Sequence, residues 1–143
     1  MKKIKLCLLQ GNSFYSHVFK QNLHNLGYSD VSLFKNASAM LENLNNPPDV
    51  IIYDFDVDCF GGEEIVKSLR IAFPDAYLLF GCFLEESYLI PKFLQCGAAD
   101  SFFKDQHEMK SVENLLENIS RKKNQAEEKL PVNVSQNKAL NVL

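Results

Sequence analysis

Three aspartates, Asp54, Asp56 and Asp58, stand within five positions in the stretch PPDVIIYDFDVDCFGG (residues 47–62), directly after a run of apolar residues. A carboxylate at the end of a buried strand can bind a divalent cation or act as the nucleophile in phosphoryl transfer. Carboxylates can also do no more than solvate a loop. Which of these roles applies depends on the other elements that meet at the same place.

Short apolar runs alternate along the chain with segments of helical periodicity. Strands are expected at 4–10, 30–34, 50–54, 76–82 and 101–103, and helices at 13–26, 37–45, 63–72, 85–95 and from about 107–109 to 120. Ser13 is the expected N-cap of the first helix, and Gly27 is expected to follow its end. Helices between strands require parallel crossovers, and buried parallel strands read as continuous apolar runs. The sequence therefore predicts one α/β domain with a doubly wound, five-stranded parallel sheet.

In such sheets, ligands bind outside the carboxyl ends of the strands. Asp54 ends the third expected strand, Gln10 and Gly11 follow the first, Cys82 ends the fourth, and Lys104 follows the fifth. These positions can converge on one crevice. An aspartate that faces a lysine there can accept a phosphoryl group while the lysine balances its charge.

These residues and their spacing resemble the receiver domain of bacterial response regulators, over residues 2 to about 120. PDVIIYD resembles the motif that ends in the phosphoacceptor, here Asp54; DFDVDCFGG resembles the loop that ends in glycine, here Gly62; CGAADSFFKD resembles the segment that ends in a lysine, here Lys104. The resemblance implies the flavodoxin-like strand order 2-1-3-4-5. It also implies phosphate contacts at Lys104 and Cys82 and a role in a two-component phosphorelay pathway.

The chain departs from the family pattern where the metal should bind. Receivers carry two acidic residues after the first strand, which hold Mg²⁺ together with the phosphoacceptor, but Gln10 and Gly11 stand in those places. Asp56 stands where the family offers a backbone carbonyl, and solvation of the loop is the favoured role of both Asp56 and Asp58. Without the metal, the charge that develops in phosphoryl transfer loses its main counterweight. Weak or absent Mg²⁺ binding is therefore expected, and no other cofactor.

The switch residues of the family are altered as well. Cys82 replaces the hydroxyl residue that contacts the phosphoryl group, Ser101 replaces the aromatic residue that moves with it, and Asp105 replaces the proline after the lysine. Pro91 falls within the fourth expected helix, where its missing N–H should kink or delay the helix. The surface that receivers use for signalling, around the fourth and fifth helices, is therefore expected to be reshaped.

These departures favour a degenerate receiver that is not an enzyme and acts by contact with a protein, either a histidine kinase or a downstream effector. A homodimer is a further alternative. A conventional receiver phosphorylated on Asp54 stays open, and so does an Asp54–Lys104 ion pair that only locks one conformation. From another class, a flavodoxin-like redox protein could hold a flavin at the loop QGNSFYS (residues 10–16).

Composition limits the expected partners and cellular compartment of the protein. The 143 residues carry a net charge of −3, with −6 on residues 1–120 and +3 on residues 121–143, which gives no case for binding nucleic acid or membrane. Four cysteines without a CxxC pair indicate reduced thiols and a cytoplasmic protein. Residues 121–143 are expected to form a flexible polar tail or linker in which Pro131 blocks a long helix.

Overall fold

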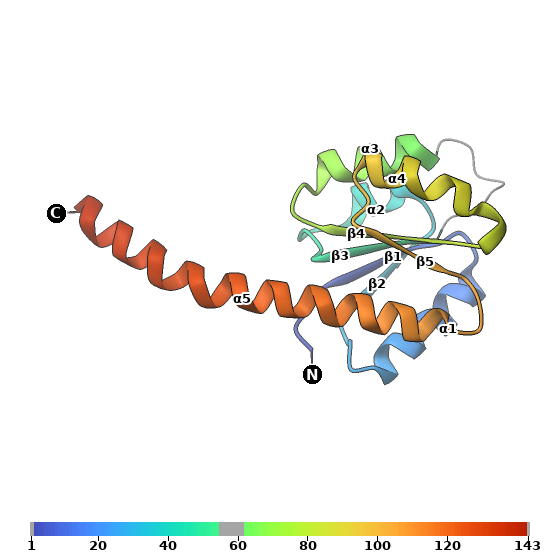
Figure 1. The fold of residues 1–143 in the computed structure, drawn as a ribbon, viewed down its shortest axis with the longest axis horizontal. Coiled ribbons are helices and arrows are strands. Elements are labelled where there is room, and N and C mark those ends of the chain that lie inside the picture. Colours follow the sequence, from blue (N-terminus) through green and yellow to red (C-terminus); the bar gives the residue numbers. More distant parts are fainter. Residues whose placement is uncertain (1, 55–61, 143) are drawn as a thin grey trace.

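The sheet has the predicted order. The computed structural model describes residues 2–54 and 62–142, with side chains described up to Glu127. The five strands are β1 (Leu6–Leu9), β2 (Val31–Phe34), β3 (Val50–Asp54), β4 (Tyr77–Cys82) and β5 (Asp100–Phe103). They pair in parallel in the order β2-β1-β3-β4-β5, as Figure 1 shows. The prediction of a doubly wound five-stranded parallel sheet is confirmed.

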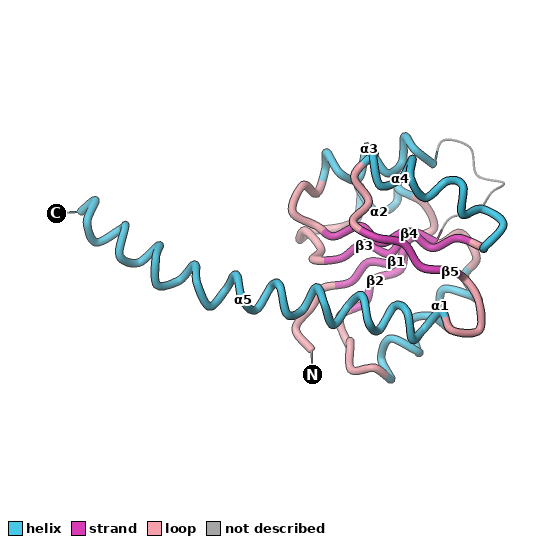
Figure 2. Tube along the Cα trace, viewed as in Figure 1, coloured by secondary structure: helices cyan, strands magenta, loops and turns pink. Residues whose placement is uncertain are grey.

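Helices cover both faces of the sheet (Figure 2). They are α1 (Ser13–Asn25), α2 (Ala37–Asn43), α3 (Gly62–Ala72), α4 (Ile90–Cys96) and α5 (Glu108–Val142), and a 3₁₀ helix, η1 (Leu84–Leu89), precedes α4. Successive strand residues point to opposite faces, so Leu6 and Leu8 of β1 pack under α1 and α5, whereas Cys7 and Leu9 pack under α2, α3 and α4. Two cores therefore hold the sheet rigidly between two helical layers.

The boundaries of α1 follow its capping residues. Asn12, and not Ser13 as expected, is the N-cap, because its side chain accepts a hydrogen bond from the Tyr15 backbone N–H at 3.0 Å. Gly27 follows the helix with a φ of +100°, a conformation that favours glycine, as the sequence predicted. The loop between β1 and α1 is therefore only three residues long, which holds it close to the strand ends.

The fourth helix starts later than the expected range of 85–95, which is the delay, and not the kink, among the two effects predicted for Pro91. Residues 84–89 form the 3₁₀ helix η1, and α4 begins at Ile90, so Pro91 lies in the first turn of α4. An N–H in the first turn of a helix has no partner within the helix, so proline costs nothing there. Pro91 thus marks the start of α4 and does not distort its interior.

Helix α5 is longer than the sequence predicted. It runs from Glu108 to Val142 and passes through Pro131, so the expectation that Pro131 blocks a long helix is wrong. A proline inside a helix removes one hydrogen bond and its ring crowds the carbonyl four residues earlier, which can kink a helix without ending it. In Figure 1 the end of α5 extends well beyond the sheet. Among the described residues, no helix is both long and apolar enough to cross a membrane.

Candidate functional site

The residues singled out by the sequence meet at the carboxyl ends of the strands. Asp54 and Cys82 are the last residues of β3 and β4, and Gln10 and Lys104 directly follow β1 and β5. The Gln10 N–H donates to the Phe34 carbonyl at 3.0 Å, and the Lys104 N–H donates to the Cys82 carbonyl at 2.9 Å. These bonds continue the sheet pairing one residue past each strand and fix where both side chains start.

Asp54 and Lys104 form an ion pair in the interior. The Lys104 Nζ lies 2.6 Å from Asp54 Oδ1. The Asp54 side chain is 0% exposed and that of Lys104 is 11% exposed, so water screens this pair far less than a surface pair. The structure thus brings together the two residues that the sequence placed at opposite sides of the crevice.

Gln10 holds the second oxygen of the same carboxylate. Its Nε2 donates to Asp54 Oδ2, and its Oε1 accepts from the Asn12 backbone N–H at 3.0 Å. A carboxylate only accepts and a backbone N–H only donates, so these two partners fix which end of the Gln10 amide faces Asp54. Gln10 therefore presents a hydrogen-bond donor where a metal site would need an oxygen ligand.

Two aromatic rings flank the Lys104 ammonium. The Lys104 Nζ lies 4.5 Å from the centre of the Phe83 ring and 5.6 Å from the centre of the Tyr15 ring. Both distances fit cation–π attraction, which gains strength away from water. Sequence reasoning assigned neither Tyr15 nor Phe83 to the site. The sequence could have pointed to them by position, because Phe83 directly follows β4 and Tyr15 lies in the first turn of the helix after β1.

Tyr15 also joins α1 to α5. Its hydroxyl donates to the carboxylate of Glu108, which begins α5. Burial raises the pKa of Glu108 above its usual value of 4.5; the bond from Tyr15 opposes this rise, and the nearby Asp54 charge adds to it. Burial and the bond to Glu108 likewise raise the pKa of Tyr15. Sequence reasoning missed Glu108, which is 93 positions away from Tyr15.

Cys82 and Gly11 complete the strand ends. The Cys82 thiol is fully buried, and burial raises its pKa to about 11, so it stays protonated and is a weak donor. Gly11 is exposed and offers no side chain to the crevice. Neither residue therefore replaces the hydroxyl or carboxylate that stands at these positions in the receiver family.

The described residues do not fit Mg²⁺. The ion prefers several oxygen ligands in octahedral geometry, usually with one or two carboxylates. Asp54 already faces Lys104 and Gln10, and the amide oxygen of Gln10 accepts from Asn12. No group of three acidic, histidine or cysteine side chains that could hold a metal occurs in residues 2–54 and 62–127. Asp56 and Asp58 lie outside the described residues.

Comparison with protein-family models gave no match, and neither did comparison with the sequences of curated proteins. Solved structures are similar. A two-component response regulator from Clostridium difficile has a TM-score of 0.74 at 19% identity, covering 85% of this chain and 99% of that one. A response regulator receiver domain protein from Clostridium thermocellum has a TM-score of 0.72 at 17% identity, covering 85% and 98%.

A third similar structure, described as an adenylate cyclase from Rhodopirellula baltica, has a TM-score of 0.71 at 16% identity. It covers 92% of this chain and 98% of that one. At such identities the likeness concerns the course of the backbone and not the side chains of the site. The chain has the fold of response-regulator receiver domains.

Proposed function

We propose that this chain is a receiver-like signalling module of a two-component phosphorelay pathway that acts by contact with a protein partner. In this proposal Asp54 does not serve as a conventional Mg²⁺-dependent phosphoacceptor, and the chain is neither an enzyme nor the carrier of a cofactor. The receiver fold and the meeting of Asp54 with Lys104 support the signalling part. The environment of Asp54 supports the rest.

The Gln10–Asp54 hydrogen bond is the observation that carries the proposal. A receiver needs a metal at this position to neutralise the charge of the transferring phosphoryl group. Here the carboxamide of Gln10 and the ammonium of Lys104 already hold the two carboxylate oxygens. A phosphodonor would have to break both contacts, and the side chains that the structure describes offer no metal site in return.

Contact with a protein has support at the surface of η1 and α4. Four large apolar side chains are more than 40% exposed there: Phe83, Leu84, Tyr88 and Leu94. Exposed apolar side chains that gather on one surface are typical of protein contact sites. A histidine kinase or a downstream effector is the proposed partner, and pairing of two copies is the alternative.

The other readings have less support. A flavin phosphate would have to contact the loop after β1, but Gln10 and Asn12 are engaged with Asp54 and with the start of α1. A cytoplasmic location belongs to the proposal because Cys7, Cys82 and Cys96 are free thiols, as expected in a reducing compartment. The experiment must therefore distinguish the proposed function from conventional phosphorylation of Asp54.

The test is incubation of the whole chain with acetyl phosphate, with and without Mg²⁺, followed by intact mass measurement. The expected result is no added phosphate in either condition. The Asp54→Ala variant is the control for modification elsewhere. A Mg²⁺-dependent gain of one phosphate that Asp54→Ala abolishes would overturn the proposal and establish a conventional receiver.

A further inference from the structure

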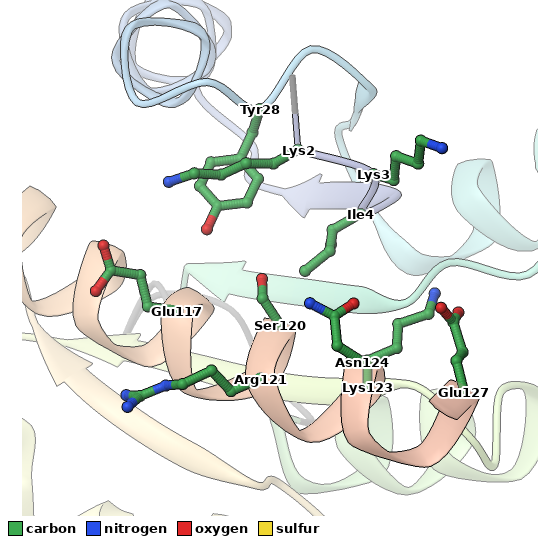
Figure 3. Close-up of a pocket in the computed structure, with 10 residues that line it drawn as sticks. All are labelled: Lys2, Lys3, Ile4, Tyr28, Glu117, Ser120, Arg121, Lys123, Asn124 and Glu127. Atoms are coloured by element: carbon green, nitrogen blue, oxygen red, sulfur yellow. The ribbon is translucent and has the colours of Figure 1, made fainter. Parts of the chain in front are cut away.

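A pocket of about 730 Å³ lies between the N-terminal segment and α5 (Figure 3). Its lining residues Lys2, Lys3 and Ile4 precede β1, and Tyr28 precedes β2, so the pocket lies at the edge of the sheet opposite Asp54. The other lining residues come from the stretch of α5 between Glu117 and Glu127. Its volume is within the range of pockets that bind small molecules.

Two buried hydroxyl groups in this pocket have no hydrogen-bond partner among the described residues. They are the Tyr28 OH and the Ser120 Oγ. In Figure 3 the Tyr28 hydroxyl points toward α5, and the Ser120 side chain points from α5 toward Tyr28. A buried hydroxyl without a partner costs free energy, so a group that offers acceptor oxygens to both would be stabilised there.

The pocket is also positively charged on an acidic domain. Four basic and two acidic side chains line it, whereas residues 1–120 as a whole carry −6. Lys123 is paired with Asp49. Lys2, Lys3 and Arg121 form no ion pair with any side chain that the structure describes. The Arg121 guanidinium donates to Asn118, and in Figure 3 its side chain points away from Tyr28, so it would have to turn to reach an anion there.

From these observations we propose that the pocket binds a small organic anion, one that carries a phosphate or carboxylate group on an apolar body. The anionic oxygens would accept hydrogen bonds from Tyr28 and Ser120 and face Lys2 and Arg121. The apolar body would lie against Ile4 and the Tyr28 ring. This site is separate from the Asp54 site and does not depend on the function proposed above.

Entry to the two hydroxyls requires movement of the groups that cover them, and Lys2 is one side chain that can move. Both oxygens are covered in the present conformation, and the Lys2 Nζ lies 4.7 Å from the centre of the Tyr28 ring. Lys2 is exposed and has a flexible side chain, so it can turn from the ring toward an anion. A bound anion would then join the N-terminal segment to Ser120 and Arg121 of α5 and fix the helix where it leaves the domain.

The test is titration of the whole ¹⁵N-labelled chain with phenyl phosphate, benzoate and inorganic phosphate, followed by amide chemical shifts and calorimetry. Saturable binding is expected, with the largest shifts at Tyr28, Ser120 and Arg121. Phenyl phosphate or benzoate should bind more tightly than inorganic phosphate, because only they can use the apolar side of the pocket. Tyr28→Phe and Ser120→Ala should each weaken binding about fivefold, the equivalent of one hydrogen bond.

Lys122→Gln is the matched control for Arg121→Gln, because Lys122 neighbours Arg121 on α5 but does not line the pocket. Arg121→Gln should weaken binding and Lys122→Gln should not. Tyr28→Phe should leave the thermal midpoint of the free protein unchanged or higher, since it removes an unpartnered buried hydroxyl. No saturation by any probe, shifts confined to Lys104 and its neighbours, or equal effects of Arg121→Gln and Lys122→Gln would overturn the proposal.

Discussion

The two edges of the sheet treat their polar groups in opposite ways. At the carboxyl edge, both oxygens of the buried Asp54 are held by Lys104 and Gln10. At the other edge, the hydroxyls of Tyr28 and Ser120 are buried without a hydrogen-bond partner among the residues that the structure describes, and more basic than acidic side chains line the pocket there. The polar groups of the Asp54 edge are therefore hydrogen-bonded within the chain, whereas the two hydroxyls of the Tyr28 edge can still accept a ligand as partner.

This difference bears on where a ligand can bind. A ligand at the Asp54 edge must first displace contacts that are already made, and that cost reduces its net affinity. A ligand at the Tyr28 edge forms hydrogen bonds that the free protein lacks. Under the two proposals above, a ligand would therefore bind more readily at the Tyr28 edge than at the Asp54 edge, which is the edge that binds phosphate in the receiver family.

The largest expected effect comes from removing the charge of Lys104. Lys104→Met keeps an apolar stem between Phe83 and Tyr15 but leaves the buried Asp54 carboxylate without its cation. Breaking a buried ion pair on one side typically costs about 3–5 kcal/mol. Urea unfolding at neutral pH should show a loss of unfolding free energy of that order.

Lys92→Met is the matched control, because Lys92 pairs with Glu63 at 3.2 Å with both side chains well exposed. Its loss should be below about 1 kcal/mol. Adding Asp54→Asn to Lys104→Met should recover much of the stability, since no buried charge remains. Equal losses in Lys92→Met and Lys104→Met would mean that the Asp54 edge is not a closed interior site.

The next largest effect is expected from substitutions that introduce two carboxylates beside Asp54 and so create a metal site. Among the described residues, Gly11 has room for a side chain, because a Cβ there would meet only the Lys35 carbonyl, at 4.0 Å, and its φ is not positive. The double variant Gln10→Asp/Gly11→Asp should be less stable than the native chain without metal, since three carboxylates face one another. Mg²⁺ should restore about 2.7 kcal/mol at a concentration about one hundred times its Kd.

Urea unfolding with and without Mg²⁺ measures both parts of that prediction. The native chain is the control and should show no change with Mg²⁺. Gln10→Asp alone, in case the double variant does not fold, should gain part of the Mg²⁺ response. A native chain that Mg²⁺ stabilises as much as the variant would show that Gln10 does not close the site.

The sequence predicted the sheet and the meeting of Asp54 with Lys104 because both follow from burial and topology. A parallel strand covered on two faces must be apolar throughout, so VIIYD marked Val50–Asp54 without reference to the rest of the chain. The ends of parallel strands share one edge, so the convergence of Asp54 and Lys104 followed from strand order. Neither inference needed the direction of any single hydrogen bond.

The sequence could not predict which side chains donate and which accept at the site, because this depends on the folded loops and helix ends. The Asn12 N–H occupies the amide oxygen of Gln10 and so turns the amide nitrogen toward Asp54. The Asn12 N–H reaches this place only when the loop after β1 has folded. Tyr15 and Glu108 meet across 93 positions of sequence. The sequence left open whether Pro91 kinks or delays the fourth helix, and the delay became clear only from the structure, in which η1 precedes α4 and α4 starts at Ile90.

The packing behind the Asp54 edge gives a third prediction. Gly81 pairs with Asp54 across β3 and β4, and a Cβ at Gly81 would lie 2.5 Å from the Phe102 ring. Gly81→Ala should therefore cost about 1–3 kcal/mol in urea unfolding, as overpacking does. Gly11→Ala, which has space, should be neutral or stabilise by about 0.5 kcal/mol. Recovery in Gly81→Ala/Phe102→Leu would assign the loss to this contact, and similar losses in both glycine variants would contradict it.

The smallest expected effect concerns the pH dependence of the Tyr15–Glu108 contact. The pKa of Glu108 is raised in the folded protein, so its contribution to stability is fully present below 4.5 and is lost as the pH rises through the folded value. The Tyr15 hydroxyl limits that rise, because it donates to the carboxylate. Tyr15→Phe should therefore raise the pKa of Glu108 further and lower stability by about 1 kcal/mol more at neutral pH than below 4.5.

Urea unfolding over a pH series measures this difference, and Glu108→Gln provides its control. A glutamine does not titrate, so Tyr15→Phe in the Glu108→Gln background should lower stability by the same amount at every pH in this range. If the pH dependence persisted without Glu108, the responsible carboxylate would be another one near Tyr15, and Asp54 is the charge that also acts on the pKa of Tyr15. That result would assign the pH dependence to a group other than Glu108 and would contradict the prediction.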